Sequence, residues 1–431
     1  MIDYKMQLSP EHVAILNGEK GETMRKILET VVIYGDTFGA KRLVKVTHNR
    51  GHLVTSFGMG LLKPTYWCFD ELVASNLKVS EGFTMDPRPT DFKNVKCNAI
   101  EKFVFNILYS KQESYEEQLK KVGLLDDKSF TCTCYLEENE NTPKYKDIIA
   151  WSESSAVNFA NSVLGARCNR NSGMIDVFQS ILGYVPEYGL LLDENRKATW
   201  VVEVKTSKIP EAQILGSAIG IKVMDAVPYV KGLDKFLGTE LDEKTISYLK
   251  DFGAATASNG AVGLYHIDNI TPEAKELKED LIAKGAKIYV IDDEELERVY
   301  KSYPNMWKKQ DAKPQVCFIG CPHLTYYQLL DWHKKLKETL KEKGLEKVTC
   351  QVIFNSAPKV IDKLIKLNKD VYDDFYKMGA TISSICPLMY TSNPLVQGKA
   401  IMTNSNKLRT YSMARYFKDE KVLDLISGGK Y

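Results

Sequence analysis

The sequence has no apolar run long enough to cross a bilayer. A membrane-spanning helix needs about 18 or more largely apolar residues, and the 431 residues contain no such stretch. The first residues also lack the basic segment and apolar core of a secretory signal. These absences exclude an integral membrane protein and lead us to expect a cytoplasmic protein with no membrane partner.

An excess of charge of one sign is missing as well. The chain has 58 basic and 56 acidic residues, which gives a formal net charge of +2. Steering onto a polyanion requires a field of one sign, so we expect no nucleic-acid partner. The apolar fraction of 44% and the charged fraction of 26% are those of ordinary globular domains, which excludes an intrinsically disordered chain.

Several well-known catalytic motifs are absent. The sequence has no G-x-G-x-x-G, no G-x-x-x-x-G-K-[ST], no H-E-x-x-H and no G-x-S-x-G. Nucleotide binding, zinc-protease chemistry and serine hydrolysis therefore lose support. Cysteine is present nine times, an odd number at low density, and thiols in a reducing compartment are core residues, metal ligands or nucleophiles more often than disulfide partners.

The last third of the chain alternates helix and strand signals with clear boundaries. Thr271 and Pro272 predict the start of a helix that ends at Gly285, and a short apolar run at 287–291 predicts a strand. Further strands are expected at 315–319, 348–354, 381–385 and 400–402, with helices between them. This alternation predicts an α/β fold with parallel, doubly wound sheets.

The middle of the chain follows the same pattern less regularly. Strands are expected at 200–204 and 261–267, and Ser152 is expected to cap a helix that ends at Gly165. We expect three lobes: an N-terminal α/β lobe over 1–130, a central α/β lobe over 131–270, and a C-terminal doubly wound α/β lobe over 271–431.

Two cysteines follow predicted strands of the C-terminal lobe. Cys321 comes after the strand at 315–319 and Cys386 after the strand at 381–385, and a proline follows each. Because the carboxyl ends of parallel strands border the ligand-binding crevice, we expect both thiols at one edge of the sheet, where they can converge on a single centre. The alternative is that each is a small buried hydrophobe that ends a strand.

A second cysteine pattern lies before the Ser152 helix. Cys132 and Cys134 form a C-x-C pair, and a thiolate near a helix N-terminus is stabilised by the helix dipole. Either thiol can therefore be a ligand or a nucleophile, although alternation along a strand explains the spacing without any function.

Potential anion-binding groups occur at three places. The arginine side chain matches carboxylate and phosphate in a forked geometry. Small residues allow a backbone to approach a ligand closely. Amide, hydroxyl and ammonium groups beyond a strand end can hold a carboxylate. The alternative for the arginines is pairing with surface acids near a helix end. The residues concerned are Arg167, Asn169 and Arg170, then Ser258 in a small-residue run, then Asn404, Ser405 and Lys407.

Together, several phrases of the sequence resemble the aconitase X family over nearly the whole chain. They are LSP at 8–10, GAKRLV at 39–44, TCT at 131–133, WSESSA at 151–156, NSVLGAR at 161–167, YGLLLDEN at 188–195, SNGAVGLYH at 258–266, GCPH at 320–323 and CP at 386–387. The resemblance implies an aconitase-like multi-lobe fold and an iron–sulfur-dependent hydro-lyase that dehydrates a small hydroxy acid. Known members resemble mevalonate 5-phosphate dehydratases or cis-3-hydroxy-L-proline dehydratases, and both substrates stay open here.

The resemblance also implies roles for particular residues. The cluster ligands would be Cys132, Cys321 and Cys386, with Cys134 and Cys168 as alternatives because the sequence departs from the family pattern there. Glu153 is the candidate base if the base lies on this chain. The substrate would be bound by Arg167, Asn169, Arg170, Ser258, Asn404, Ser405 and Lys407.

The family's enzymes also contain a smaller swivelling domain, which carries an essential serine in the aconitase superfamily. The 431 residues leave no segment to form it. The resemblance therefore implies a large subunit that works in a heterodimer with a separately encoded small subunit. The alternative is a non-catalytic binding or regulatory subunit that has kept the fold.

Overall fold

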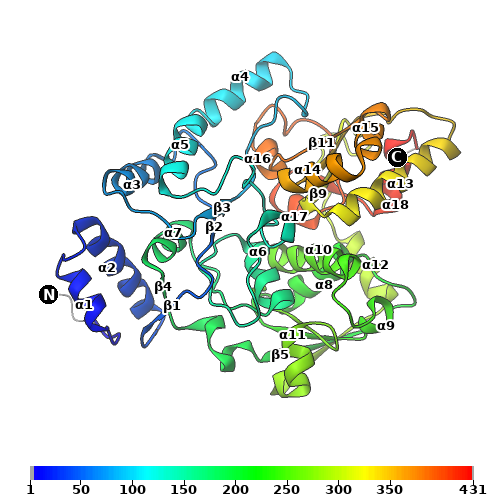
Figure 1. Ribbon diagram of the computed structural model, residues 1–431. Coiled ribbons are helices and arrows are strands. Elements are labelled where there is room, and N and C mark those ends of the chain that lie inside the picture. The colour runs from blue at the N-terminus through cyan, green and yellow to red at the C-terminus, as the bar shows by residue number, and fades with distance from the viewer. Residues whose placement is uncertain (1–3, 430–431) are drawn as a thin grey trace.

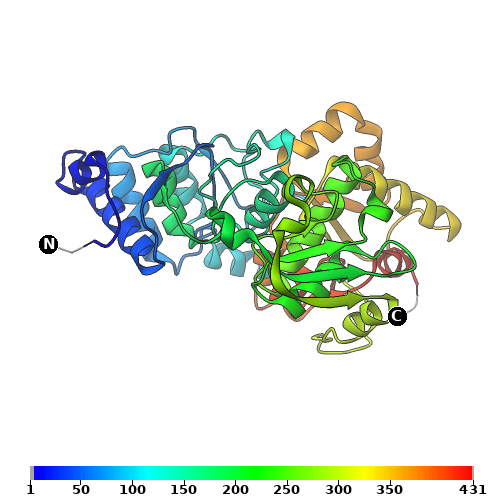
Figure 2. The same cartoon turned by 90° about the horizontal axis from the view of Figure 1, so that it is seen from below.

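The computed structural model describes residues 4–429, which form an elongated α/β molecule with the N-terminal helices at one end (Figures 1 and 2). Two parallel sheets of four and five strands lie in the C-terminal two thirds. The predicted α/β class with parallel, doubly wound sheets is therefore confirmed. No helix among the described residues is both long and apolar enough to span a membrane.

The N-terminal part is mostly helical and contains two small two-stranded sheets. β1 pairs with β4 in an antiparallel manner, and β2 pairs with β3 in parallel. The elements are α1 (Pro10–Leu16), α2 (Glu22–Thr37), β1 (Leu43–Lys45), β2 (Gly51–Leu53), α3 (Lys63–Ala74), β3 (Phe83–Met85), α4 (Ala99–Leu108), α5 (Gln112–Val122), α6 (Ser154–Phe159), α7 (Gly173–Leu182) and β4 (Tyr184–Pro186).

The cap of α6 differs from the prediction. Glu153, not Ser152, is the N-cap residue, and its carboxylate accepts a hydrogen bond of 2.6 Å from the backbone N–H of Ala156. Ser152 instead accepts a hydrogen bond from the backbone N–H of Val54. The helix continues as a π-helical turn and ends at Gly165, as predicted.

The central sheet has the strand order β7-β6-β5-β8, and all pairs are parallel. Its elements are β5 (Ala198–Val204), α8 (Ala212–Val223), β6 (Pro228–Lys231), α9 (Asp234–Leu237), α10 (Glu243–Asn259), β7 (His266–Ile267), α11 (Pro272–Leu277), β8 (Ile282–Ile291) and α12 (Asp293–Lys301). The predicted lobe boundary between 270 and 271 falls inside this sheet, because β8 pairs with β5. Strand pairing favours a boundary after β8, and the division into three lobes stays a prediction.

The helix expected to end at Gly285 is shorter than predicted. Helix α11 ends at Leu277, and Gly285 lies inside β8. The strand begins earlier than the apolar run alone indicates, because residues from Ile282 onward pair with β5. The glycine was therefore wrongly interpreted as a helix end.

The C-terminal sheet has the order β11-β10-β9-β12-β13, and all its pairs are parallel. Its elements are β9 (Val316–Leu324), α13 (Tyr326–Glu342), β10 (Gln351–Ser356), α14 (Pro358–Leu367), α15 (Lys369–Lys377), β11 (Ala380–Ser383), α16 (Pro387–Thr391), β12 (Ile401–Thr403), α17 (Asn406–Tyr411), β13 (Arg415–Tyr416) and α18 (Asp419–Ile426). The chain runs outward from β9 to β11 and then returns to β12 on the other side of β9. The carboxyl ends of β9 and β12 thus form a topological switch point, where ligands bind in open α/β sheets.

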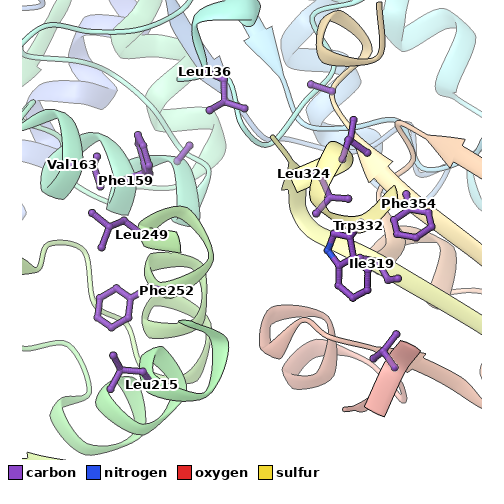
Figure 3. Packing of buried hydrophobic residues seen from close by; sticks show 14 of the residues in the cluster. Leu136, Phe159, Val163, Leu215, Leu249, Phe252, Ile319, Leu324, Trp332 and Phe354 are labelled. Atoms are coloured by element: carbon purple, nitrogen blue, oxygen red, sulfur yellow. The ribbon is translucent and has the colours of Figure 1, made fainter. Parts of the chain in front are cut away.

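One apolar core joins the two large sheets. Buried residues of α6 and α10, such as Phe159, Leu249 and Phe252, belong to the same cluster as Leu324 of β9 and Trp332 of α13 (Figure 3). This continuous core holds the central and C-terminal sheets together.

Candidate functional site

A small cavity of about 40 Å³ lies at the switch point of the C-terminal sheet. Cys132, Cys321 and Cys386, the three predicted ligands, all line it, although they come from distant parts of the chain. The remaining lining residues are Phe57, Asp86, Pro87, Gly320, His323, Pro387, Leu388, Met389 and Lys407. The fold thus brings the three thiols to one place beside a single ammonium group.

Cys321 is positioned by an unusual backbone turn within β9. The preceding residue, Gly320, has a φ of +98°, and a Cβ atom there would lie 2.5 Å from the backbone oxygen of Asn355. Only glycine fits this position without displacing the neighbouring strand. The backbone oxygen of Cys321 in turn accepts a hydrogen bond from the hydroxyl of Ser405.

Cys132 and Cys386 are held by segments that follow short strands. The backbone N–H of Thr131 donates to the oxygen of Met85, at 2.7 Å, which aligns the loop carrying Cys132 with the end of β3. Cys386 is the N-cap residue of α16, and its backbone N–H donates to the oxygen of Arg88, at 2.8 Å. Both cysteines are therefore attached to the segment that leaves β3.

Lys407 on α17 is the only lysine that lines the cavity, and it forms a buried ion pair with Glu153. Its ammonium also lies 3.2 Å from the hydroxyl of Ser155. Burial alone would raise the pKa of Glu153, but Lys407 and the hydrogen bond from Ser155 outweigh it and lower the pKa to about 2. Burial opposes the charged form of Lys407, but the carboxylate of Glu153 outweighs it and raises the pKa of the lysine. The pair is therefore ionised and fixed behind the cavity.

Asp86 is a cavity residue that the sequence did not indicate. Its Oδ1 atom has no hydrogen-bond partner among the described residues and lies 3.6 Å from Nε2 of His52. Burial, followed by repulsion from Glu153, raises the pKa of Asp86 well above its ordinary value. Burial lowers the pKa of His52 to about 4, so this histidine is neutral at pH 7. The Asp86 carboxyl can therefore keep its proton.

His323 supports the loop that carries Cys132. Its backbone N–H donates to Sγ of Cys132 at 3.4 Å, and its Nδ1 atom is paired with the hydroxyl of Thr131 at 3.1 Å. Burial lowers the pKa of His323 to about 3, so the ring is neutral. The histidine lies in the GCPH phrase, which is the only signal that could have found it.

The three cavity thiols hold their protons firmly, and a metal centre would have to replace those protons in order to bind. Burial raises the pKa of all three thiols, and that of Cys386 reaches about 12. No three metal-binding side chains among the described residues are arranged to hold a single metal ion. Three cysteine thiols at one cavity are the kind of donor set that holds an iron–sulfur cluster.

The predicted substrate-binding residues divide into two groups. Lys407 lines the cavity, whereas Ser405 caps α17 and donates a hydrogen bond to the backbone oxygen of Cys321, a cavity residue. Asn404 is close in sequence, but its amide donates to Asp419 at 2.9 Å. Ser258 lies inside α10, and its hydroxyl donates to the backbone oxygen of Ala254.

The residues after the π-helical turn lie away from the three cysteines and do not line their cavity. Arg167 donates to the backbone oxygen of Leu191 and pairs with Asp193. Asn169 and Arg170 line a separate surface cavity of about 280 Å³. Their role in binding the substrate stays a prediction that the geometry does not favour.

The two alternative cysteine ligands are also outside the cavity lining. Cys134 is fully buried in the apolar core. Cys168 points its thiol at the backbone oxygens of Trp151 and Asn169, at 3.5 and 3.2 Å. The geometry therefore favours Cys132 over both as the ligand from the N-terminal half.

Two models of known protein families match the chain. The family model of the aconitase X first domain matches residues 5–194, and that of the second domain matches residues 198–301. The chain belongs to the aconitase X family.

Individual relatives cover most of the chain. It is 34% identical to the phosphomevalonate dehydratase large subunit of Thermococcus kodakarensis, over 79% of this chain and 78% of that protein. It is 31% identical to the large subunit of the same name from Methanosarcina mazei, over 99% and 98%. The cis-3-hydroxy-L-proline dehydratase of Hypocrea jecorina is 24% identical over 94% of this chain but only 65% of its own length.

A solved structure matches in fold. The crystal structure of Thermococcus kodakaraensis aconitase X in its holo-form has a TM-score of 0.78 and 29% identity, over 98% of this chain and all of that chain. The aconitase-like fold and the hydro-lyase class expected from the resemblance are thus confirmed.

Proposed function

We propose that the chain is the large subunit of an iron–sulfur-dependent dehydratase whose substrate is mevalonate 5-phosphate. The observation that carries this proposal is the meeting of Cys132, Cys321 and Cys386 on one cavity beside Lys407. Cys132, Cys321 and Cys386 would hold the cluster through their thiolates. A cluster bound there would supply a Lewis acid that makes hydroxide a better leaving group.

Lys407 provides the positive charge that the substrate needs. Its ammonium is held in place by Glu153 and Ser155, so it is pre-oriented before the substrate arrives. In this proposal Lys407 binds the carboxylate or phosphate of the hydroxy acid and stabilises negative charge that develops on it. Ser405 fixes the Cys321 backbone at the same edge.

Asp86 is the group that we propose as the general acid. Burial, followed by repulsion from Glu153, raises the pKa of this carboxyl well above its ordinary value, which favours its protonated form. The unpartnered Oδ1 atom can deliver that proton to the departing hydroxyl and convert it to water. The base that removes the proton from the neighbouring carbon is then expected on the partner.

Glu153 fits a positioning role better than its predicted role as the base. Its carboxylate already accepts hydrogen bonds from Ala156 and Ser155 and pairs with Lys407. Its lowered pKa makes it a weak proton acceptor. We therefore assign Glu153 to holding Lys407.

The substrate and the partner are inferred from the relatives. Five of the matched relatives are named phosphomevalonate dehydratase large subunits. A large subunit implies a small one, and we propose that a swivelling small subunit completes the site as a heterodimer. All nine cysteines are free thiols, which suits the reducing cytoplasm where we propose that the enzyme acts.

The test is anaerobic co-expression with the small-subunit chain from the same genome. The purified pair should contain iron and sulfide and should dehydrate mevalonate 5-phosphate, whereas cis-3-hydroxy-L-proline should react at least about a hundredfold more slowly, because its binding differs at the anionic groups. If the iron-loaded pair converts only cis-3-hydroxy-L-proline, the assignment of mevalonate 5-phosphate as the substrate is wrong. A folded, iron-free pair that is fully active would overturn the cluster, and a pair without any dehydratase activity would favour a regulatory subunit.

A further inference from the structure

Helix α4 carries large apolar side chains on both of its faces. Its inner residues Phe105 and Tyr109, the latter at the C-cap, are buried. On the outer face, Ile100, Phe103 and Ile107 are 67%, 64% and 57% exposed. Large apolar side chains that gather on the exposed side of a helix mark an interaction surface, so the outer face of α4 has the composition of an interface.

A neighbouring loop extends this face. The backbone N–H of Gly60 donates to the oxygen of Leu108 at 2.9 Å, which fixes the loop against the C-terminal end of α4. The next residue, Leu61, is 84% exposed. We call the four side chains of Leu61, Ile100, Phe103 and Ile107 the α4 patch. Figure 1 shows α4 at the outer edge of the molecule, where a partner can approach it.

The α4 patch is connected to the cysteine cavity through both of its elements. Phe57, four residues before Leu61, lines the cavity. Behind α4, Phe105 packs in the same apolar cluster as Cys321. The hydroxyl of Tyr109 donates to the backbone oxygen of Met389, another cavity residue, at 2.8 Å. The elements that carry the patch therefore pack directly against residues that line the cavity.

Positive charge surrounds the α4 patch. Lys63, Lys96, Lys102 and Lys111 are exposed and flank Leu61 and the two ends of α4. None of the four forms an ion pair within residues 4–429. The chemistry of the surface thus requires a partner with an apolar centre and carboxylates around it.

We propose that the α4 patch is the docking surface for the small subunit, an inference that rests on the two-subunit function proposed above. The cavity itself holds only about 40 Å³, room for a few water molecules and far less than a ligand pocket of roughly 300 Å³ or more. The substrate site must therefore be completed beyond the cavity, and a small subunit on α4 lies where it can supply the missing wall.

The experiment compares binding of the co-encoded small-subunit chain to variants of the full chain. The double variant Phe103→Ser with Ile107→Ser removes the centre of the patch, and Lys102→Glu reverses one charge on its rim. Ile288→Ser on β8 is the matched control, because Ile288 is 66% exposed and lies on another lobe. Dissociation constants and association rates are measured at low and high salt, and thermal unfolding checks that each variant is folded.

The double variant should weaken binding by about tenfold to a hundredfold, as expected when interface anchors are truncated. Lys102→Glu should slow association at low salt, and the control should bind as the wild type does. If the double variant binds the small subunit as tightly as the wild type does, the α4 patch is not the docking surface, while the proposed dehydratase heterodimer still stands. Self-association of this chain through the α4 patch, or binding of the patch to anionic vesicles, would also overturn the proposed docking of the small subunit. If no pair forms and the isolated chain dehydrates its substrate, the two-subunit function fails as well.

Discussion

The ion pair between Lys407 and Glu153 gives the sharpest quantitative prediction. Both side chains are buried, at 7% and 4% exposure. The variant Lys407→Met keeps the length of the side chain but leaves the Glu153 carboxylate without its cation. Removing one partner of a buried pair costs about 3–5 kcal/mol of folding free energy.

The pKa of Glu153 gives a second route to the magnitude. In the folded protein the pKa is lowered from its ordinary 4.5 to about 2. At about 1.4 kcal/mol per pKa unit, this difference corresponds to about 3 kcal/mol of stability at neutral pH. The two routes agree, so we expect Lys407→Met to lower the free energy of unfolding by about 3 kcal/mol or more.

The pH dependence has opposite signs in the two proteins. In the wild type, the contribution of Glu153 is fully present above pH 4.5 and is lost as the pH falls toward the lowered pKa. In Lys407→Met, the unpaired buried carboxylate of Glu153 should have a raised pKa. The loss of unfolding free energy caused by this buried charge is therefore largest at neutral pH and decreases as the pH falls. The two stabilities should therefore converge on acidification from pH 7 to pH 5.

The assay is urea unfolding of the chain at both pH values, with the double variant Lys407→Met and Glu153→Gln as the control. The double variant removes both charges and should recover at least half of the lost stability. A Lys407→Met protein within about 1 kcal/mol of the wild type, or one whose penalty grows on acidification, would show that the pair is not a buried and tightly coupled one.

Three further predictions follow from the geometry. Gly320→Ala should lower the unfolding free energy by about 2–3 kcal/mol, measured from the urea midpoint, because the added Cβ would lie 2.5 Å from the oxygen of Asn355; an unchanged midpoint would mean that the turn is not needed. Asp86→Asn should lower kcat by about a hundredfold or more while the visible absorption of the cluster persists, and full activity would remove Asp86 from the mechanism. Arg167→Ala should leave KM within about twofold, because Arg167 pairs with Asp193 away from the cavity, whereas a tenfold rise in KM would restore it as a substrate ligand.

The parallel C-terminal sheet and the meeting of Cys321 and Cys386 were predictable because their signals are local, although Cys321 lies inside β9 and not after the strand. Apolar runs of strand length, separated by capped helices, specify the βα alternation, and the right-handed crossover rule then brings the carboxyl ends of the strands to one edge. Cys321 and Cys386 meet at one cavity for that reason. The choice of Cys132 over Cys134 came only from the family resemblance, because nothing local shows that the Cys132 loop aligns with β3.

Other parts of the site were beyond sequence reasoning. Asp86 follows β3, and this strand has only three residues, which is too few for a hydrophobic periodicity that could have predicted it. The role of Glu153 as a cap and a partner of Lys407 depends on a contact between residues that are distant in the chain. Arg167 illustrates another limit, since the composition around it cannot distinguish a ligand site from the ion pair that it forms with Asp193.

The central claim is tested most directly by the iron and sulfide content of single cysteine variants, prepared anaerobically as the two-subunit complex. Cys132→Ser, Cys321→Ser and Cys386→Ser should each lose most of the iron and the visible absorption, whereas Cys350→Ser and Cys134→Ser, outside the cavity lining, should keep both. If the three cavity variants retain full iron content while folded, or if Cys134→Ser alone loses it, the three thiols at the switch point are not the ligands.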